Sequence, residues 1–362
     1  MLLRIEKLNF SRLRGHFVSN PVFSTEETSG LWRNFRALMA EKGIKSDFYS
    51  VQIHEQNAPG KIIERWAAVK EGEGLPSGLQ SLEIPAGLYA VFLYKGGAGG
   101  FVEFYQDQCS RAIPDLGLML DERPHFQLLG DKFNPFSDDS EEEIWIPVKP
   151  GLDPDAYRLC NIAAISSLLS LGHNMGKLRT RLQLALETGF SLSDLKEIII
   201  QVSLYAGFPR SLNGMACLRE VIGERQNQGL PINPGKNPSP QPAYKSRYEL
   251  GWETLQSLDD EFILKLKAGL DPVSPELFTL VLEHGYADIF YRDNLDIRQR
   301  EAAVVAAMVA VENADPQLSF HMLASLKTGI HRDVLVRMIS IAAKEAGKSP
   351  KHALHLLEQI NP

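Results

Sequence analysis

The chain has 362 residues, of which 44% are hydrophobic and 23% charged, and its formal net charge is -7. This length suffices for two or three domains, and the composition is ordinary for a soluble globular protein. The negative charge argues against general binding of nucleic-acid phosphates, because such binding requires clustered lysine and arginine.

The first 150 residues combine strand and helix patterns. Apolar residues at helical spacing predict helices over residues 26–41 and 101–113. Short runs rich in β-branched and aromatic residues predict strands. These runs are residues 47–53, 65–69, 80–84, 87–94 and 143–148. The mixture is typical of an α+β domain, and we place this domain at residues 1–150.

From Asp153 onward the pattern is helical. Asp153-Pro154 predicts a helix start, with the aspartate as cap and proline in the first turn. The segment Leu230–Pro242 (LPINPGKNPSPQP) predicts a linker, because its prolines and glycine sustain neither helix nor strand. The sequence therefore predicts two helical domains, at residues 151–229 and 243–362, with residues 230–242 between them.

Two helical segments look like copies of one unit, offset by 140 positions. The matched pairs include Leu178/Leu318, Leu182/Met322, Leu186/Leu326, Gly189/Gly329, Leu195/Leu335 and Ile199/Ile339. At two matched positions the copies differ: Asn161 and Arg181 in the first copy correspond to Glu301 and His321 in the second. Any proton-transfer pair therefore belongs to the second copy.

Glu301 and His321 are the candidates for acid–base chemistry. Glu301 lies on an apolar helical stripe, and a carboxylate placed among aliphatic side chains must be paired or protonated. His321 borders the apolar face of the next predicted helix. If the two helices pack together, the acid orients the imidazole as a general base. The alternative interpretation is a structural tie between two helices.

An acid also stands out in the N-terminal domain. Glu143 opens the run EIWIPV, so on a strand Glu143 and Trp145 share one face. An acid beside an indole is suited to the floor of an apolar cavity that attracts cations. Two other interpretations stay open: a solvated charge run over residues 141–143, and aromatic residues that only form a core.

The stretches SLEIPAGLYAVFLYKG (residues 81–96) and DKFNPFSDDSEEEIWIPVK (residues 131–149) resemble the GyrI-like small-molecule-binding domain, which also serves as the effector-binding part of AraC- and MerR-type regulators. The resemblance implies an α+β (SOUL-type) fold that binds hydrophobic, aromatic or cationic molecules. It implies an acid facing an aromatic cavity. The candidate ligand-binding residues are Glu143, Trp145, Trp66, Tyr89, Tyr105 and Trp32.

The stretches YAGFPRSLNGM (residues 205–215), REAAVVAAM (residues 300–308) and PQLSFHMLASLKTG (residues 316–329) resemble the carboxymuconolactone decarboxylase family, which includes alkylhydroperoxidase-type proteins. The resemblance implies two all-α repeats and a catalytic Glu301/His321 pair. No C-x-x-C precedes His321, so dithiol peroxidase activity is not expected. Arg181 is a candidate for binding a substrate carboxylate, and Phe208 and Pro209 are candidates for completing the pocket.

The chain is therefore interpreted as a multidomain fusion of a GyrI-like domain with two carboxymuconolactone decarboxylase-like repeats. The first functional hypothesis is binding or sensing of a small molecule. The alternative is an enzyme, a lyase or isomerase that acts on a lactone or carboxylic acid by proton transfer at Glu301 and His321.

The remaining expectations concern partners and location. No cofactor and no metal site are expected, because His352 and His355 lack a third ligand in the sequence. No run approaches the roughly 18 apolar residues of a membrane-spanning helix, and charges interrupt the first residues. We expect a cytoplasmic homo-oligomer whose partner is a small molecule, without direct contact to nucleic acid or membrane.

Overall fold

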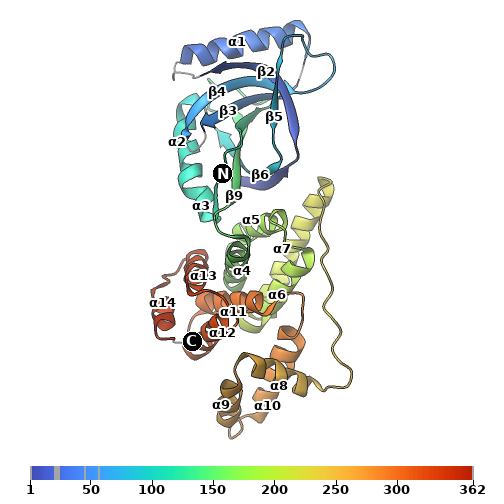
Figure 1. Cartoon of the computed structure of the whole chain (residues 1–362), viewed down its shortest axis with the longest axis vertical. Helices are drawn as coiled ribbons and strands as arrows, with labels where there is room; N and C mark the ends of the chain where they lie inside the picture. The colour runs from blue at the N-terminus through green and yellow to red at the C-terminus, as the bar shows by residue number, and fades with distance from the viewer. Residues whose placement is uncertain (1, 20–24, 45, 56–57, 361–362) are drawn as a thin grey trace. The chain divides into compact units, whose positions relative to one another are not determined.

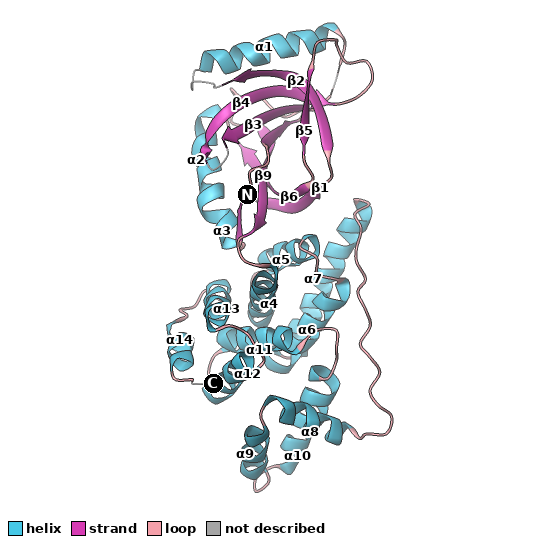
Figure 2. Cartoon of the chain, viewed as in Figure 1, coloured by secondary structure: helices cyan, strands magenta, loops and turns pink. Residues whose placement is uncertain are grey.

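The computed structural model describes residues 2–19, 25–44, 46–55 and 58–360. These residues form two compact units, Met1–Leu152 and Asp153–Pro362. The first unit combines strands and helices, whereas the second contains helices alone among its described elements (Figure 1, Figure 2). In the part of the chain that is described, no helix has the length and apolar character needed to cross a membrane.

The first unit is built on an antiparallel sheet with strand order β1-β6-β9-β8-β3-β4-β2-β5, and β7 pairs with β9. Its elements are β1 (Leu2–Leu8), β2 (Ser11–Ser19), α1 (Thr25–Glu41), β3 (Phe48–Glu55), β4 (Ala58–Lys70), β5 (Gln80–Ile84), β6 (Gly87–Lys95), the short helix η1 (Ala98–Gly100), α2 (Phe101–Asp107), the π-helical turn η2 (Gln108–Ala112), α3 (Ile113–Asp115), β7 (Leu118–Leu120), β8 (His125–Leu129) and β9 (Glu141–Pro150).

The two halves of this sheet have the same topology. The order β2-α1-β3-β4 in the first half is repeated as β6-α2-β8-β9 in the second. Strands β3 and β8 pair at the centre, β1 pairs with β6, and β5 pairs with β2. Strand β1, which precedes the first half in sequence, is therefore the outermost strand of the second half. Strand β5, which precedes the second half, is the outermost strand of the first.

The predicted strands correspond to β3, β4, β5, β6 and β9, and the two predicted helices correspond to α1 and to the continuous helical run from α2 to α3. Four strands were not predicted: β1, β2, β7 and β8. Strands β1 (LLRIEKL) and β2 (SRLRGHFVS) carry charged residues at alternating positions, because much of their length is only partly buried. Strand β7 has three residues, which is too short for a periodic signal.

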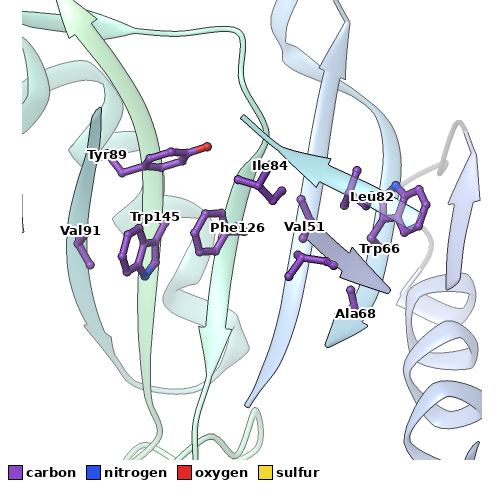
Figure 3. Packing of buried hydrophobic residues seen from close by; sticks show 10 residues of the cluster. Val51, Trp66, Ala68, Leu82, Ile84, Tyr89, Val91, Phe126 and Trp145 are labelled. Atoms are coloured by element: carbon purple, nitrogen blue, oxygen red, sulfur yellow. The ribbon is translucent and has the colours of Figure 1, made fainter. Parts of the chain in front are cut away.

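Each face of the sheet carries an apolar cluster. Helix α1 covers the outer face through a cluster that includes Leu31, Phe35, Met39, Ala67 and Val69 (Figure 1). The inner, concave face carries the larger cluster. Its buried members are Leu13, Val51, Trp66, Ala68, Leu82, Ile84, Tyr89, Val91, Phe126 and Trp145 (Figure 3). Alternation along the strands separates the two sets.

The second unit consists of helices α4 (Pro154–Leu171), α5 (Met175–Glu187), α6 (Leu192–Ala206), α7 (Phe208–Asn227), α8 (Arg247–Leu258), α9 (Asp260–Leu270), α10 (Pro275–Leu280), the π-helix η3 (Val281–Phe290), α11 (Ile297–Val311), α12 (Asp315–Lys327), α13 (Arg332–Glu345) and α14 (Lys351–Glu358). Asp153 caps α4 as predicted, since its side chain accepts from the backbone N–H groups of Asp155 and Ala156.

Helices on the two sides of the predicted linker pack into one core. The bounds of α5 and α6 lie at the expected offset from those of α12 and α13. Helix α4 packs against α11 and α13, and α11 packs against α6. Helix α11 is buried on all sides from Arg300 to Ala310, so the predicted single apolar stripe describes only part of its contacts. The linker itself accepts hydrogen bonds from the start of α6, at Asn233 and Pro234.

Candidate functional site

One row of residues crosses the concave face of the sheet. Backbone pairing places Phe17, Trp66, Val51, Phe126, Trp145, Val91 and Arg4 side by side on successive strands. The middle of the row is visible in Figure 3, from Val91 and Trp145 through Phe126 and Val51 to Trp66. The ring of Phe126 stacks on that of Trp145, with centroids 5.1 Å apart. The row brings two indoles onto one apolar surface.

Glu143, two residues before Trp145 on β9, lies beside the end of this row that Arg4 occupies, and it is ion-paired with Arg4. Its Oε1 accepts a 2.8 Å hydrogen bond from Arg4 Nη1, and its Oε2 accepts one of 3.1 Å from Arg4 Nη2. The Trp145 indole N–H donates to Oε2 at 3.1 Å. The Arg4 guanidinium carbon also lies 5.2 Å from the Trp145 ring centroid, within the range of a cation–π contact. Acid and indole thus bind a cation that the chain supplies itself.

The structure brings four of the six predicted ligand-binding residues to the concave face. Trp66, Tyr89 and Trp145 are buried in its cluster, and Glu143 shares the strand face of Trp145. Burial raises the pKa of Tyr89 to about 12, and its hydroxyl donates to the carbonyl of Pro124. These aromatic residues pack against one another, so they form a core as well as a candidate binding surface.

Trp32 and Tyr105 do not join this set, because they lie on the outer face. Trp32 packs with the outer-face cluster under α1. Tyr105, on α2, has its hydroxyl 2.5 Å from Nδ1 of His125. His125 alternates along β8 with Phe126 and so points away from the concave face. Burial lowers the pKa of His125 to about 3, so its imidazole is neutral at physiological pH.

Glu142 is a second buried acid on β9, and it also faces the outer side. It is 7% exposed, and its Oε2 has no hydrogen-bond partner among the described residues. Burial raises the pKa of Glu142 from 4.5 to about 7. Because the folded state holds the proton more tightly than the unfolded state, the stability of this unit falls as pH rises from about 4.5 to about 7.

Glu142→Gln should remove this pH dependence. We expect the variant to exceed the wild type in unfolding free energy at pH 8 by at most about 3 kcal/mol, and to lose the advantage near pH 4. Urea unfolding between pH 4 and pH 8 measures the effect. Glu141→Gln is the control: Glu141 is ion-paired with Lys95 and Lys132, which lower its pKa, so its removal should not flatten the profile.

One acid on the concave face was not among the predicted site residues. Glu64, two residues before Trp66 on β4, accepts a 2.8 Å hydrogen bond from the Trp66 indole N–H. The same contact joins Trp145 and Glu143 on β9. The sequence holds a signal for it, because ERWAAVK (residues 64–70) and EIWIPVK (residues 143–149) share the pattern E-x-W-x-x-V-K.

In the second unit the structure brings Glu301 and His321 together. His321 Nδ1 lies 2.9 Å from Glu301 Oε2, and the two residues are 5% and 0% exposed. Glu301 Oε1 has no partner among the described residues. The His321 ring contacts Tyr205 of α6 edge-on and stacks against Phe290. A carboxylate that holds one imidazole nitrogen leaves the other for proton exchange with a substrate.

The matched position of the first half is an ion pair. Arg181 Nη2 donates to Glu345 Oε1 at 2.6 Å, and both residues are buried. Tyr205 and Glu345 are themselves matched at the offset of 140 residues. Tyr205 of the first half contacts His321 of the second, and Glu345 of the second half binds Arg181 of the first, so each of the two sites combines residues of both halves. The carboxylate that Arg181 binds in the structure is thus Glu345.

Phe208 and Pro209 lie at the start of α7 and are exposed. The Phe208 ring contacts His284. Among the described residues, neither of them forms a hydrogen bond or a ring contact with Glu301 or His321. His352 and His355 are also exposed, and His352 pairs with Asp315. Within residues 2–19, 25–44, 46–55 and 58–360, no group of three or more His, Cys, Asp or Glu side chains has the geometry of a metal site.

Two curated relatives each match part of this chain. Transcriptional regulator BrlR of Pseudomonas aeruginosa is 31% identical over 122 residues, which are 33% of this chain and 45% of that protein. The 4-carboxymuconolactone decarboxylase of Acinetobacter baylyi is 38% identical over 80 residues, which are 22% of this chain and 55% of the enzyme. The chain spans about half the length of the curated relatives it matches.

Among solved structures, SAV2435 bound to tetraphenylphosphonium is 19% identical, with 41% of this chain and 94% of that chain covered and a TM-score of 0.33. The decisive match is to a family model. The GyrI-like small molecule binding domain matches residues 8–149, which include the whole row from Phe17 to Trp145 and both acid–indole pairs. Residues 8–149 therefore form a GyrI-like small-molecule-binding domain.

Proposed function

We propose that the first unit binds a hydrophobic, aromatic cation on its concave face. The observation that carries this proposal is the Arg4 guanidinium, which is bound by the Glu143 carboxylate and lies over the Trp145 ring. A surface that accommodates a guanidinium in this way has the chemistry for an organic cation, with an aromatic lining for its apolar part.

Tetraphenylphosphonium is a suitable probe, and triphenylphosphine oxide is a neutral control of related shape. We expect the cation to raise the melting temperature of the full chain, because a ligand that binds the folded state stabilises it by mass action, by about 2.7 kcal/mol at 100 times its Kd. The neutral compound should produce a much smaller shift. Equal shifts with both compounds would show that charge plays no part in recognition.

A role in sensing follows from the same binding event. The relative BrlR is a transcriptional regulator. We propose that the first unit reports the presence of its ligand to a partner, with no direct contact to nucleic acid by the described residues. A cytoplasmic location and a homo-oligomeric state remain predictions from the sequence.

We further propose that the second unit is a pair of carboxymuconolactone decarboxylase-like repeats and that Glu301 and His321 transfer a proton. The buried contact between His321 Nδ1 and Glu301 Oε2 supports this second function. In this mechanism Glu301 fixes the tautomer of the imidazole, and Nε2 takes a proton from a lactone or carboxylic acid. At the position that matches His321, the first half has Arg181, which is paired with Glu345. This supports a single reactive site, in the second half.

Release of carbon dioxide from 4-carboxymuconolactone tests this proposal. We expect turnover by the wild type, and a loss of about 10²- to 10⁴-fold in His321→Ala, the range typical of general acid–base catalysis. Glu301→Gln should lower the rate as well, because an amide no longer stabilises the imidazolium. Turnover that is unchanged in both variants would assign the pair a structural role alone.

A further inference from the structure

We propose that Glu64 and Trp66 form a second cation-accepting site at the opposite end of the concave row, and that this site receives the charge of the ligand while Arg4 occupies Glu143. The inference rests on the proposed binding of an aromatic cation by the first unit. It assigns the binding of the ligand's charge to Glu64 in place of Glu143.

The two ends of the row are built alike. Glu64 and Trp66 on β4 correspond to Glu143 and Trp145 on β9, and in each pair the indole N–H donates to the carboxylate two residues earlier. Both tryptophans belong to the same buried cluster. They are separated by three strand spacings, about 14 Å between their backbones. The face therefore presents two separate acid–indole pairs.

Among the described strands, a cation reaches the Glu143 end of the row alone. At the Glu143 end, Arg4 of β1 lies opposite Val91, which lies opposite Trp145. At the Glu64 end, Phe17 lies opposite Trp66, but β5 pairs with β2 only from Ser11 to Gly15. The edge strand thus ends before it reaches Phe17. Among the described residues, no lysine or arginine forms an ion pair with Glu64.

The Glu64 end also has the aromatic groups that a cation needs. The Phe17 ring stacks on the Trp66 ring with centroids 4.6 Å apart, as Phe126 stacks on Trp145 at the other end. Glu64 and Phe17 are both partly exposed, so an incoming ligand has access to them. A carboxylate fixed by an indole N–H beside stacked rings attracts an organic cation through charge and through cation–π contacts.

Arg4 makes the two ends unequal as binding sites. A ligand cation at Glu143 must break both guanidinium hydrogen bonds, at 2.8 and 3.1 Å, and remove the cation–π contact with Trp145. A ligand cation at Glu64 displaces no ion pair of the described residues. Arg4 therefore acts as a built-in competitor, and it determines which of two similar sites the ligand uses.

Titration calorimetry with tetraphenylphosphonium on the full chain distinguishes the two ends. We expect Glu64→Gln to weaken binding by at least about tenfold, and Glu143→Gln to change it by less than about threefold. In an Arg4→Gln background, where Glu143 is released, Glu143→Gln should become harmful. Glu83→Gln is the control for charge alone, because Glu83 is an exposed carboxylate on β5 that pairs with Arg12.

A loss of affinity confined to Glu143→Gln would overturn this inference and leave the proposed function standing. Absence of any binding to the wild type would overturn both. Trp66→Phe separates a local folding defect from a lost contact, because it keeps an aromatic ring in the cluster and removes the N–H that fixes Glu64. We expect this variant to keep the wild-type circular dichroism spectrum and to bind the cation several-fold more weakly.

Discussion

Glu197→Ala is expected to lower the free energy of unfolding of the helical unit by about 3–5 kcal/mol, the range for breaking a buried ion pair from one side. Glu197 is 2% exposed and binds two arginines. Arg292 Nη2 donates to its Oε1 at 2.6 Å, and Arg300 Nη2 donates to its Oε2 at 3.2 Å. Arg300 is fully buried, and burial lowers the pKa of its guanidinium. Without Glu197, the hydrogen-bond partners left to that charge among the described residues are the carbonyl oxygen of Arg292 and the amide oxygen of Gln201.

Urea unfolding followed by far-UV circular dichroism measures this loss, because the helical unit dominates the signal. Glu261→Ala is the matched control: Glu261 pairs with Lys265 on α9, and both side chains are largely exposed. An exposed pair contributes little, so this variant should unfold like the wild type. A similar stability for Glu197→Ala and the wild type would mean that Arg300 does not need its carboxylate.

His321→Ala is expected to cost about 3 kcal/mol at pH 8, since it leaves the Glu301 carboxylate buried with neither oxygen bonded by the groups described here. The double variant Glu301→Leu/His321→Leu should recover most of this loss, because well-packed apolar residues often replace a buried polar pair at little cost. Thermal unfolding of the three proteins measures both effects.

The same set of variants separates stability from activity. If the pair is catalytic, the double variant is folded and inactive. A double variant as unstable as His321→Ala would indicate instead that the pair specifies the packing of α11 against α12.

Much of the first unit could be predicted from local sequence. The strands β3, β5, β6 and β9 have strong apolar or alternating patterns and short Gly/Pro-containing boundaries, which are local signals. Strands β1 and β2 could not be recognised in this way, because Arg4, Arg12 and Arg14 interrupt their apolar residues. Their status as strands depends on pairing with β6, β4 and β5, which are distant in sequence.

The candidate sites show the same limit. The period-2 alternation of β9 was enough to place Glu143 beside Trp145, but the partner of Glu143 comes from β1, 139 positions away. Trp32 and Tyr105 were grouped with Glu143 by residue type, whereas the side of the sheet on which α1 and α2 pack decides their location. In the helical unit, the repeat offset singled out Glu301 and His321, yet the pairing of Arg181 with Glu345 depends on contacts between the two halves.

The segment from residue 228 to residue 246 connects α4–α7 to α8–α14. These two halves share one core, because α4 packs against α13 and α6 packs against α11. A covalent connection of this kind turns the meeting of two halves into an intramolecular event, at effective concentrations that reach the millimolar range for short flexible connections. The rate at which this core assembles is therefore first order in protein concentration, and dilution of the chain does not separate its two halves.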